Sequence, residues 1–195
     1  MKKVVFLSDY FHDQVSGGAE IYDSILIEEL ESLNTKVVRF NCREFTVKHF
    51  NLYLKTGFNF IVSNFVFLSE EVKSRLKACG HRYVIIEHDH KYLIDRDPSN
   101  YKDFIAPSNR IVNREFYKSA KMVFCQSAKH YEVVKSNLNI ENITNLGCSL
   151  WSKKQLNIIK NSFKQEKNGR CFVIQDPNPI KGLEEAKHHC DSNNL

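Results

Sequence analysis

The chain has 195 residues, a length that accommodates one full domain and little more. Hydrophobic residues make up 42% and charged residues 26%, which argues against a disordered or fibrous protein. The net charge of +5 is too small an excess to indicate nucleic-acid binding. No apolar run approaches the roughly 18 residues that cross a bilayer, and none of signal-peptide length follows Met1. We therefore expect a soluble, cytoplasmic protein.

The six cysteines are far apart in the sequence and form no Cys-x-x-Cys pair. At least two of them fall inside apolar runs that are typical of strands. We expect reduced and mostly buried thiols rather than a disulfide framework or a metal site. They are Cys42, Cys79, Cys125, Cys148, Cys171 and Cys190.

Short apolar runs alternate with helical patterns over the first 86 residues. From Gly18 the apolar residues recur three or four apart, with Glu20, Asp23 and Glu28 among the polar residues between them, which predicts an amphipathic helix of about fifteen residues. Strands are predicted at 3–8, 36–40, 59–63 and 82–86, and further helices at 46–54 and 69–79, the latter capped by Gly80. The opening is therefore a βαβ unit of a parallel sheet.

The alternation resumes after a polar stretch, 87–107, that shows no clean period and is predicted to be a long connection at one sheet edge. Next come a helix at 109–119, a strand at 121–125, a helix at 127–138 and a strand at 142–146. This pattern predicts an α/β fold for residues 1–150, with a doubly wound, mostly parallel, Rossmann-like sheet.

The last 45 residues do not continue the alternation of strands and helices seen in residues 1–150. Residues 152–167 form a basic amphipathic helix inside a linker at 151–169. A strand at 170–175, a turn at 176–179 and a helix at 181–190 then make a single βα unit. One strand and one helix cannot bury enough surface to be a domain, so we expect residues 170–195 to begin a truncated second domain.

The loop after the first strand is the most informative candidate site. It places Gly17 and Gly18 side by side at the start of a helix, whose unpaired N–H groups attract anions. Phosphate is the natural ligand, and a flexible turn feeding a helix is the alternative. The loop matches neither the dinucleotide fingerprint nor a P-loop.

A second candidate is Glu87-His88-Asp89-His90, at the end of the fourth strand. In an extended segment His88 and His90 point to one face, where they could hydrogen-bond a sugar or a phosphate. With His12 or Asp13 they could instead bind a metal such as zinc. A polar strand end whose hydrogen bonds are satisfied within the protein is the third reading.

Two weaker candidates lie toward the C-terminus. Lys181, before Gly182, could bring an ammonium and backbone N–H groups near a phosphate. The lysines of 152–167 could make weak contact with anionic lipid, but the pattern favours a solvated basic face. No nucleophile elbow, zincin or kinase motif occurs.

Four segments occur in an order that is similar to one enzyme family. They are the loop Asp9-Tyr10-Phe11 with Ser16-Gly17-Gly18-Ala19-Glu20, the segment Glu87-His88-Asp89-His90, Ala120 to Ser127, and Ile180 to Ala186. Together they resemble the retaining glycosyltransferases of family 4, which have the two-domain GT-B fold. The resemblance covers the amino-terminal domain and the start of the second.

The resemblance implies transfer of a sugar from a nucleotide-sugar donor to a sugar or lipid-linked acceptor, without metal or other cofactor. Gly17 and Gly18 would then face the donor diphosphate together with Lys181, and His88, or alternatively His90, would lie near the donor sugar. Prearranged donors would stabilise the charge on the leaving group. The matching loop also implies substrate-binding roles for three flanking residues, Asp9, Tyr10 and Glu20.

Two departures from the family limit this inference. Asp176 stands where an arginine is common, and most of the donor-binding domain is missing, so the chain alone should not turn over. A non-catalytic binding or partner module of the same fold remains the second hypothesis. A metal-dependent hydrolase that uses His12, Asp13, His88 and His90 is the third.

Overall fold

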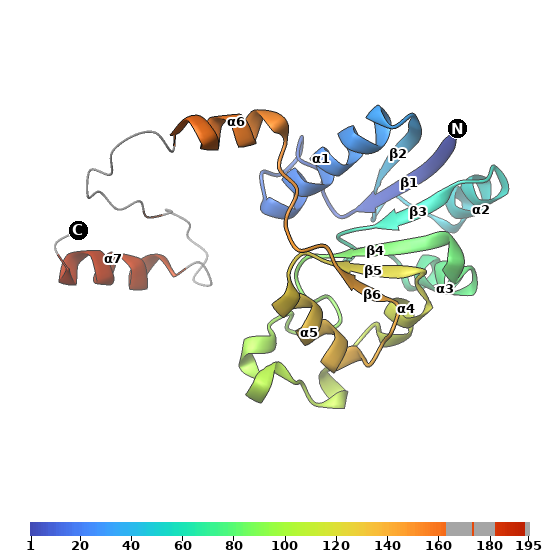
Figure 1. The fold of residues 1–195 in the computed structure, drawn as a ribbon. Helices are drawn as coiled ribbons and strands as arrows, with labels where there is room; N and C mark the ends of the chain where they lie inside the picture. The colour runs from blue at the N-terminus through green and yellow to red at the C-terminus, as the bar shows by residue number, and fades with distance from the viewer. Residues whose placement is uncertain (163–172, 174–181, 194–195) are drawn as a thin grey trace. The chain divides into compact units, whose positions relative to one another are not determined.

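All six apolar runs predicted as strands within residues 1–146 lie in one parallel sheet, shown by a computed structural model (Figure 1). The strand order is β2-β1-β3-β4-β5-β6. The strands are β1 (Lys2–Ser8), β2 (Thr35–Asn41), β3 (Asn59–Val62), β4 (Tyr83–Glu87), β5 (Met122–Cys125) and β6 (Ile143–Asn145). Helices flank the sheet on both faces, so the predicted doubly wound, Rossmann-like α/β fold is confirmed.

The structure describes residues 1–162, 173 and 182–193. The chain divides into two units, residues 1–151, which contain the sheet, and residues 152–195. The second unit contains the helices α6 (Lys153–Ser162) and α7 (Leu183–Ser192). The strand predicted at 170–175, the turn at 176–179 and Lys181 fall outside the described residues.

Five helices connect the strands: α1 (Gly18–Ser32), α2 (Val47–Lys55), α3 (Glu70–Ala78), α4 (Arg114–Ser119) and α5 (Ala128–Leu138). Hydroxyl side chains determine where three of them begin. Thr46, Ser69 and Ser127 each accept a hydrogen bond from the backbone amide three residues later, at the N-termini of α2, α3 and α5. Such caps satisfy amides that a helix leaves unpaired.

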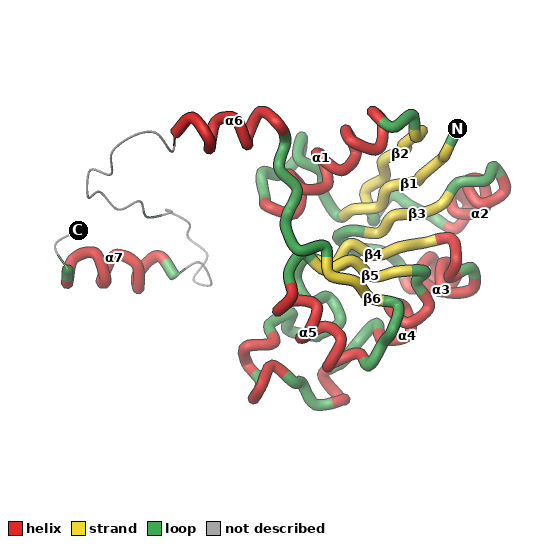
Figure 2. The backbone as a smooth tube through the Cα atoms, viewed as in Figure 1, coloured by secondary structure: helices red, strands yellow, loops and turns green. Residues whose placement is uncertain are grey.

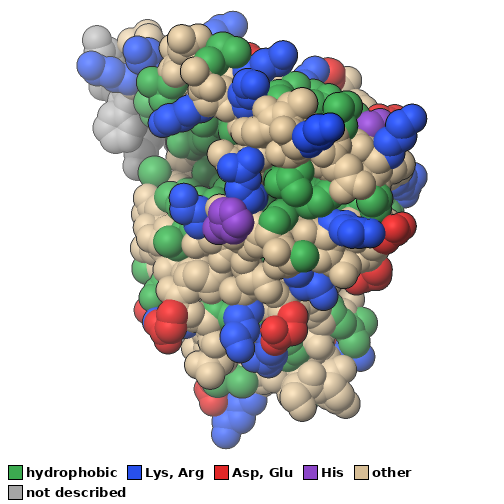
Figure 3. All heavy atoms as spheres, turned by 90° about the vertical axis from the view of Figure 1, so that its right-hand side faces the viewer, with side chains coloured by type: hydrophobic (Ala, Val, Ile, Leu, Met, Phe, Trp, Pro, Cys, Tyr) green, Lys and Arg blue, Asp and Glu red, His purple; other side chains and the backbone are tan. Residues whose placement is uncertain are grey.

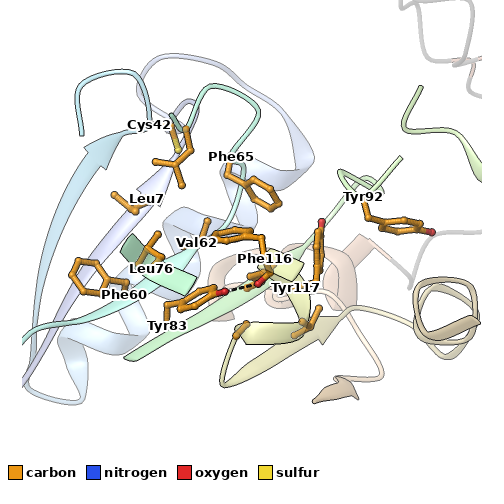
Figure 4. Packing of buried hydrophobic residues seen from close by; sticks show 14 of the residues in the cluster. Leu7, Cys42, Phe60, Val62, Phe65, Leu76, Tyr83, Tyr92, Phe116 and Tyr117 are labelled. Carbon is orange, nitrogen blue, oxygen red and sulfur yellow. Dashed lines mark hydrogen bonds between the residues drawn. The ribbon is translucent and has the colours of Figure 1, made fainter. Parts of the chain in front are cut away.

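The two faces of the sheet carry separate apolar clusters, as the alternation of side chains along a strand requires. On β1, Val5 and Leu7 belong to the larger cluster, which α2, α3, α4 and α5 cover (Figure 4). Phe6 points to the opposite face, where it packs with Phe11 and Ile27, the latter on α1. Aromatic rings such as Tyr83 and Phe116, stacked 5.0 Å apart, fill much of the larger cluster.

The strand order places a topological switch between β1 and β3. The chain leaves β1 toward β2 on one side and returns to β3 on the other, so the loops after β1 and β3 diverge. In open α/β sheets, ligands bind in the crevice that such a switch opens beyond the carboxyl ends of the strands. Here that edge carries Ser8, the last residue of β1, with Asp9 after it, and Ser63 and Asn64 after β3.

The connection between β4 and α4 differs from its prediction (Figure 2). It leaves β4, which is an internal strand, rather than an edge of the sheet. The helix predicted at 109–119 begins only at Arg114. Residues Ser108–Arg110 instead form a separate 3-10 turn, and Asn113 has a left-handed backbone with φ of 55° that interrupts any continuous helix.

The described cysteines are all free thiols, although fewer are buried than predicted. Cys42 and Cys125 are buried, whereas Cys148 is exposed. No helix among the described residues is long and apolar enough to cross a membrane. On the face in Figure 3, lysine and arginine side chains are spread among polar and apolar atoms rather than gathered into one patch.

Candidate functional site

A fully buried carboxylate, Asp23, lies at the carboxyl ends of β1 and β3. Its side chain comes from the second turn of α1 and is 0% exposed. Ser8 Oγ donates to Asp23 Oδ2 at 3.1 Å, and Ser63 Oγ donates to Oδ1 at 2.8 Å. Since Ser8 ends β1 and Ser63 follows β3, this carboxylate links α1 to both strands of the switch point.

The imidazole of His88 completes this buried polar network. Its Nε2 lies 3.0 Å from Ser63 Oγ and 3.4 Å from Asp23 Oδ1. Its Nδ1 lies 3.0 Å from Gln126 Nε2, and the Tyr22 ring packs edge-on with centroids 5.2 Å apart. Because an amide nitrogen can only donate, Nδ1 accepts and Nε2 carries the proton. The ring is therefore neutral and held from three sides.

Serine, histidine and aspartate meet here without forming a catalytic triad. In a triad the serine and the carboxylate bind opposite ring nitrogens, so that one nitrogen takes the serine proton while the carboxylate orients the ring from the other. In this network Ser63 and Asp23 share the same nitrogen of His88. Ser63 also gives its own hydrogen to Asp23. The arrangement positions a neutral imidazole and provides no route for activating Ser63.

His90 lies apart from this network, so the prediction that His88 and His90 share one face is wrong. The strand β4 ends at Glu87, residues 88–89 bend, and the backbone at His90 is left-handed with φ of 58°, so the segment is not extended. Its Nδ1 lies 3.0 Å from the Tyr92 hydroxyl, and its ring packs against His130 with centroids 4.8 Å apart. Burial lowers the pKa of His90 below its ordinary value.

The geometry does not support the metal site predicted from His12, Asp13, His88 and His90. Among the described residues no three histidine, cysteine, aspartate or glutamate side chains gather as metal ligands. Asp13 instead pairs with Arg39 at 3.5 Å on the surface, and His12 is exposed. The loop therefore does not bring these residues to His88 as a third and fourth ligand.

The paired glycines begin α1, as predicted, but they differ in how open they are. Gly17 is the N-cap, and the Glu20 carboxylate lies where a Cβ on Gly17 would stand. A Cβ on Gly18 would have no atom within 4 Å. Asn64 Nδ2 donates to Glu20 Oε1 at 3.4 Å, which links this carboxylate to the loop after β3. The N-terminus of α1 is thus open at Gly18, whereas the Glu20 carboxylate covers Gly17.

Asp9 and Tyr10 have different surroundings. The buried Asp9 carboxylate accepts from the backbone amides of Val66 at 2.8 Å and Phe67 at 3.0 Å. It therefore fixes the loop after β3 rather than facing solvent. Tyr10 is 39% exposed and packs edge-on against Phe67. Both Asp9 and Tyr10 line a pocket of about 280 Å³ together with Arg43.

Four residues of the network were not predicted from the sequence: Ser8, Asp23, Ser63 and Gln126. The apolar period of the helix places Asp23 only among the polar residues between the apolar ones, with Glu20 and Glu28. A usable signal was the pair Ser8 and Ser63, because polar residues that end two buried strands need partners inside the fold.

Comparison with known protein families, with characterised proteins and with solved structures finds no match for this chain.

Proposed function

We propose that residues 1–151 form the acceptor-side domain of a retaining glycosyltransferase, which moves a sugar from a nucleotide-sugar donor to an acceptor hydroxyl. One observation carries the proposal. The open backbone at Gly18 lies one helical turn before Tyr22 and Asp23, and these two residues contact His88. A helix N-terminus suited to phosphate and an oriented imidazole therefore lie at the same edge of the sheet.

These groups match the charges that develop when a nucleotide sugar breaks down. The departing diphosphate gains negative charge, which the unpaired N–H groups and dipole of α1 stabilise without moving a proton. Glu20 is the nearest competing anion, because its carboxylate already lies over Gly17. A bound diphosphate would approach Gly18 and displace the Glu20 side chain toward Asn64, with which it already shares a hydrogen bond.

His88 would position the donor sugar rather than exchange a proton with it. Asp23 and Ser63 hold its protonated Nε2, so only Nδ1 remains as an acceptor. Nδ1 now receives the amide of the half-buried Gln126. A sugar hydroxyl that takes the place of this amide would satisfy the same nitrogen, and the ring would keep its tautomer.

The first test is a titration of the chain with UDP, GDP and ADP, followed through its backbone amide NMR signals. We expect weak, millimolar binding that shifts the amides of Gly17, Gly18 and Ala19 and the ring signals of His88. Gly18→Leu should remove these shifts, because its side chain fills the open approach. Ser32→Leu places the same side chain at the exposed opposite end of α1 and should bind like the parent chain.

Two results would contradict the proposal. One is the absence of any shift at residues 17–19 with all three nucleotides. The other is tight binding of a nucleotide sugar by this chain alone, because the donor base and ribose would have their pocket in the second domain. Sugar transfer itself is to be measured on a polypeptide that joins this chain to a complete second domain. Failure of transfer there would favour the non-catalytic binding module.

A further inference from the structure

A second pocket, of about 460 Å³, lies between the loop after β3, the helix α3 and the segment that follows β4. Its volume is in the range of small-molecule sites. Its lining combines apolar walls with three cations and contains no carboxylate. The lining includes Phe65, Val66, Lys73, Lys91, Arg96 and Asn113.

Two of the three cations are buried, which is rare for lysine. The side chain of Lys73 is 8% exposed and that of Lys91 is 2% exposed. Both ammonium groups lie 5.7 Å from the centroid of the Phe65 ring. Burial of two like charges near one aromatic ring is costly, so their placement calls for compensating anions.

The protein compensates Lys91 more fully than Lys73. Lys91 Nζ lies 4.0 Å from Oε1 of Glu87, a fully buried carboxylate, and also contacts Asp89. Lys73 Nζ donates to Glu70 Oε1 at 2.8 Å, but Glu70 is 83% exposed, so water screens that carboxylate. Lys73 Nζ also donates to the neutral Asn113 Oδ1 at 3.3 Å. Asn113 Nδ2 in turn donates to the Lys91 carbonyl at 2.9 Å, which fixes the two lysine-bearing segments to each other. Asn113 thus links α3 and the segment after β4, which both line the pocket.

Lys91 and Arg96 together bind an anionic group, the carboxylate of Asp89. Lys91 Nζ contacts Asp89 Oδ1, and Arg96 donates from Nη1 to Oδ2 at 3.1 Å. The two cations therefore hold one carboxylate between them, each on a different oxygen. This carboxylate is 46% exposed and is not part of the pocket lining, so it can turn to solvent when another anion binds.

We propose that this pocket binds the phosphate group of a small phosphomonoester. Lys91 and Arg96 would exchange Asp89 for two phosphate oxygens, and Lys73 would contact the third. The uncharged part of the ligand would lie along Phe65 and Val66. Charge-assisted bonds from lysine and a forked guanidinium suit a phosphate, which offers several acceptor oxygens. If the chain takes part in sugar transfer as proposed, the bound phosphomonoester is the acceptor. Only this assignment rests on the proposed function.

The test is a titration with inorganic phosphate and with glucose 6-phosphate at constant ionic strength, followed by amide NMR. We expect shifts at residues 65–66, 91–96 and 112–113 for both probes, with tighter binding of the sugar phosphate. Arg96→Met should weaken binding about tenfold, as the loss of one charge-assisted contact does. Asp89→Asn should tighten it, because the competing carboxylate loses its charge.

The control removes the same charge from a neighbouring position. Lys77 is exposed on α3, one turn after Lys73, and does not line this pocket. Lys77→Met should leave the affinity unchanged. Equal weakening by Lys77→Met and Arg96→Met would show general attraction to a basic surface and overturn the proposal, as would the absence of shifts around the pocket. Arg96 is half exposed, so its replacement does not threaten folding.

The two titrations test the two proposals separately. The nucleotide titration reports on residues 17–19, and the phosphomonoester titration reports on residues 65–66, 91–96 and 112–113. Gly18→Leu should abolish only the first set of shifts, and Arg96→Met should reduce only the second. Loss of one response with the other intact identifies the proposal that fails.

Discussion

The buried Asp23 carboxylate contributes to stability through the hydrogen-bond donors around it. Two serine hydroxyls and the His88 ring direct hydrogens at its two oxygens. Asp23→Ala would leave these donors without their acceptor inside the fold, and we expect it to lower the free energy of unfolding by about 3 kcal/mol. Asp23→Asn keeps the shape and one acceptor oxygen, so its loss should be smaller. Urea denaturation at pH 7 measures both.

The control for this experiment is Asp13→Ala. Asp13 is exposed and its contact with Arg39 is a surface ion pair, so its removal should change stability by less than about 0.5 kcal/mol. An Asp23→Ala protein as stable as the Asp13→Ala protein would show that the network contributes little to the fold.

His130 makes stability depend on pH. Burial, the largest cause, lowers its pKa to about 4, and its Nε2 has no hydrogen-bond partner among the residues that the structure describes. An unfolded chain binds the proton near pH 6.5, whereas the folded one resists it until about pH 4. Stability is therefore highest above pH 6.5 and falls as the pH drops through this window, by an amount on the order of 2 kcal/mol.

His130→Phe should flatten this pH dependence. The ring keeps its volume, loses the unpartnered nitrogen and cannot take up a proton, so unfolding midpoints in urea should fall less between pH 7 and pH 4.5. His12→Phe, at an exposed position, should follow the parent protein. An unchanged slope in His130→Phe would mean that other groups, His90 first among them, cause the decline.

At the scale of elements, Gly80 shows how closely the 3-10 turn after α3, Gly80–Arg82, approaches α4. A Cβ at this position would collide with the backbone carbonyl of Ser119, the last residue of α4. Gly80→Ala should therefore force this turn and the end of α4 apart and lower stability by about 2 kcal/mol. Gly18→Ala, where a Cβ has open space, should leave the urea midpoint unchanged. Equal midpoints for the two variants would contradict the close approach.

The sequence predicts the elements well where a local pattern is enough. Apolar runs located all six strands, and the period of apolar residues located α1. It fails where backbone geometry decides. Gly80 was expected to cap a helix through its conformational freedom, yet its φ is not positive and it serves close packing. The left-handed Asn113, which delays α4, likewise has no apolar pattern that announces it.

The candidate site is predicted only in part, because its parts are distant in sequence. His88 and the glycines stand at strand and helix ends, which a linear pattern reveals. Asp23 becomes a buried partner only when β1, β3 and β4 are placed side by side, 40 residues from Ser63 and 65 from His88. Strand order, which no local period encodes, therefore separates the predicted site residues from those that were missed.

At the scale of the whole molecule, the apolar core is confined to the first unit. All buried members of both clusters lie between Val5 and Ile143, and the second unit contributes none among the described residues. Hydrophobic burial is the main favourable term in folding, so residues 1–151 contain what the sheet domain needs. The net stability of the chain should then reside in this unit.

A fragment that ends at Trp151 should therefore unfold cooperatively in urea at the same midpoint as the full chain. A second fragment that ends at Leu138 gives the contrast, because it loses β6 together with the buried Ile140 and Ile143. It leaves β5 as an unpaired edge and should unfold at a markedly lower urea concentration. A lower midpoint in the 151-residue fragment would mean that residues after 151 stabilise the sheet domain, and the division into two units would not describe how the chain folds.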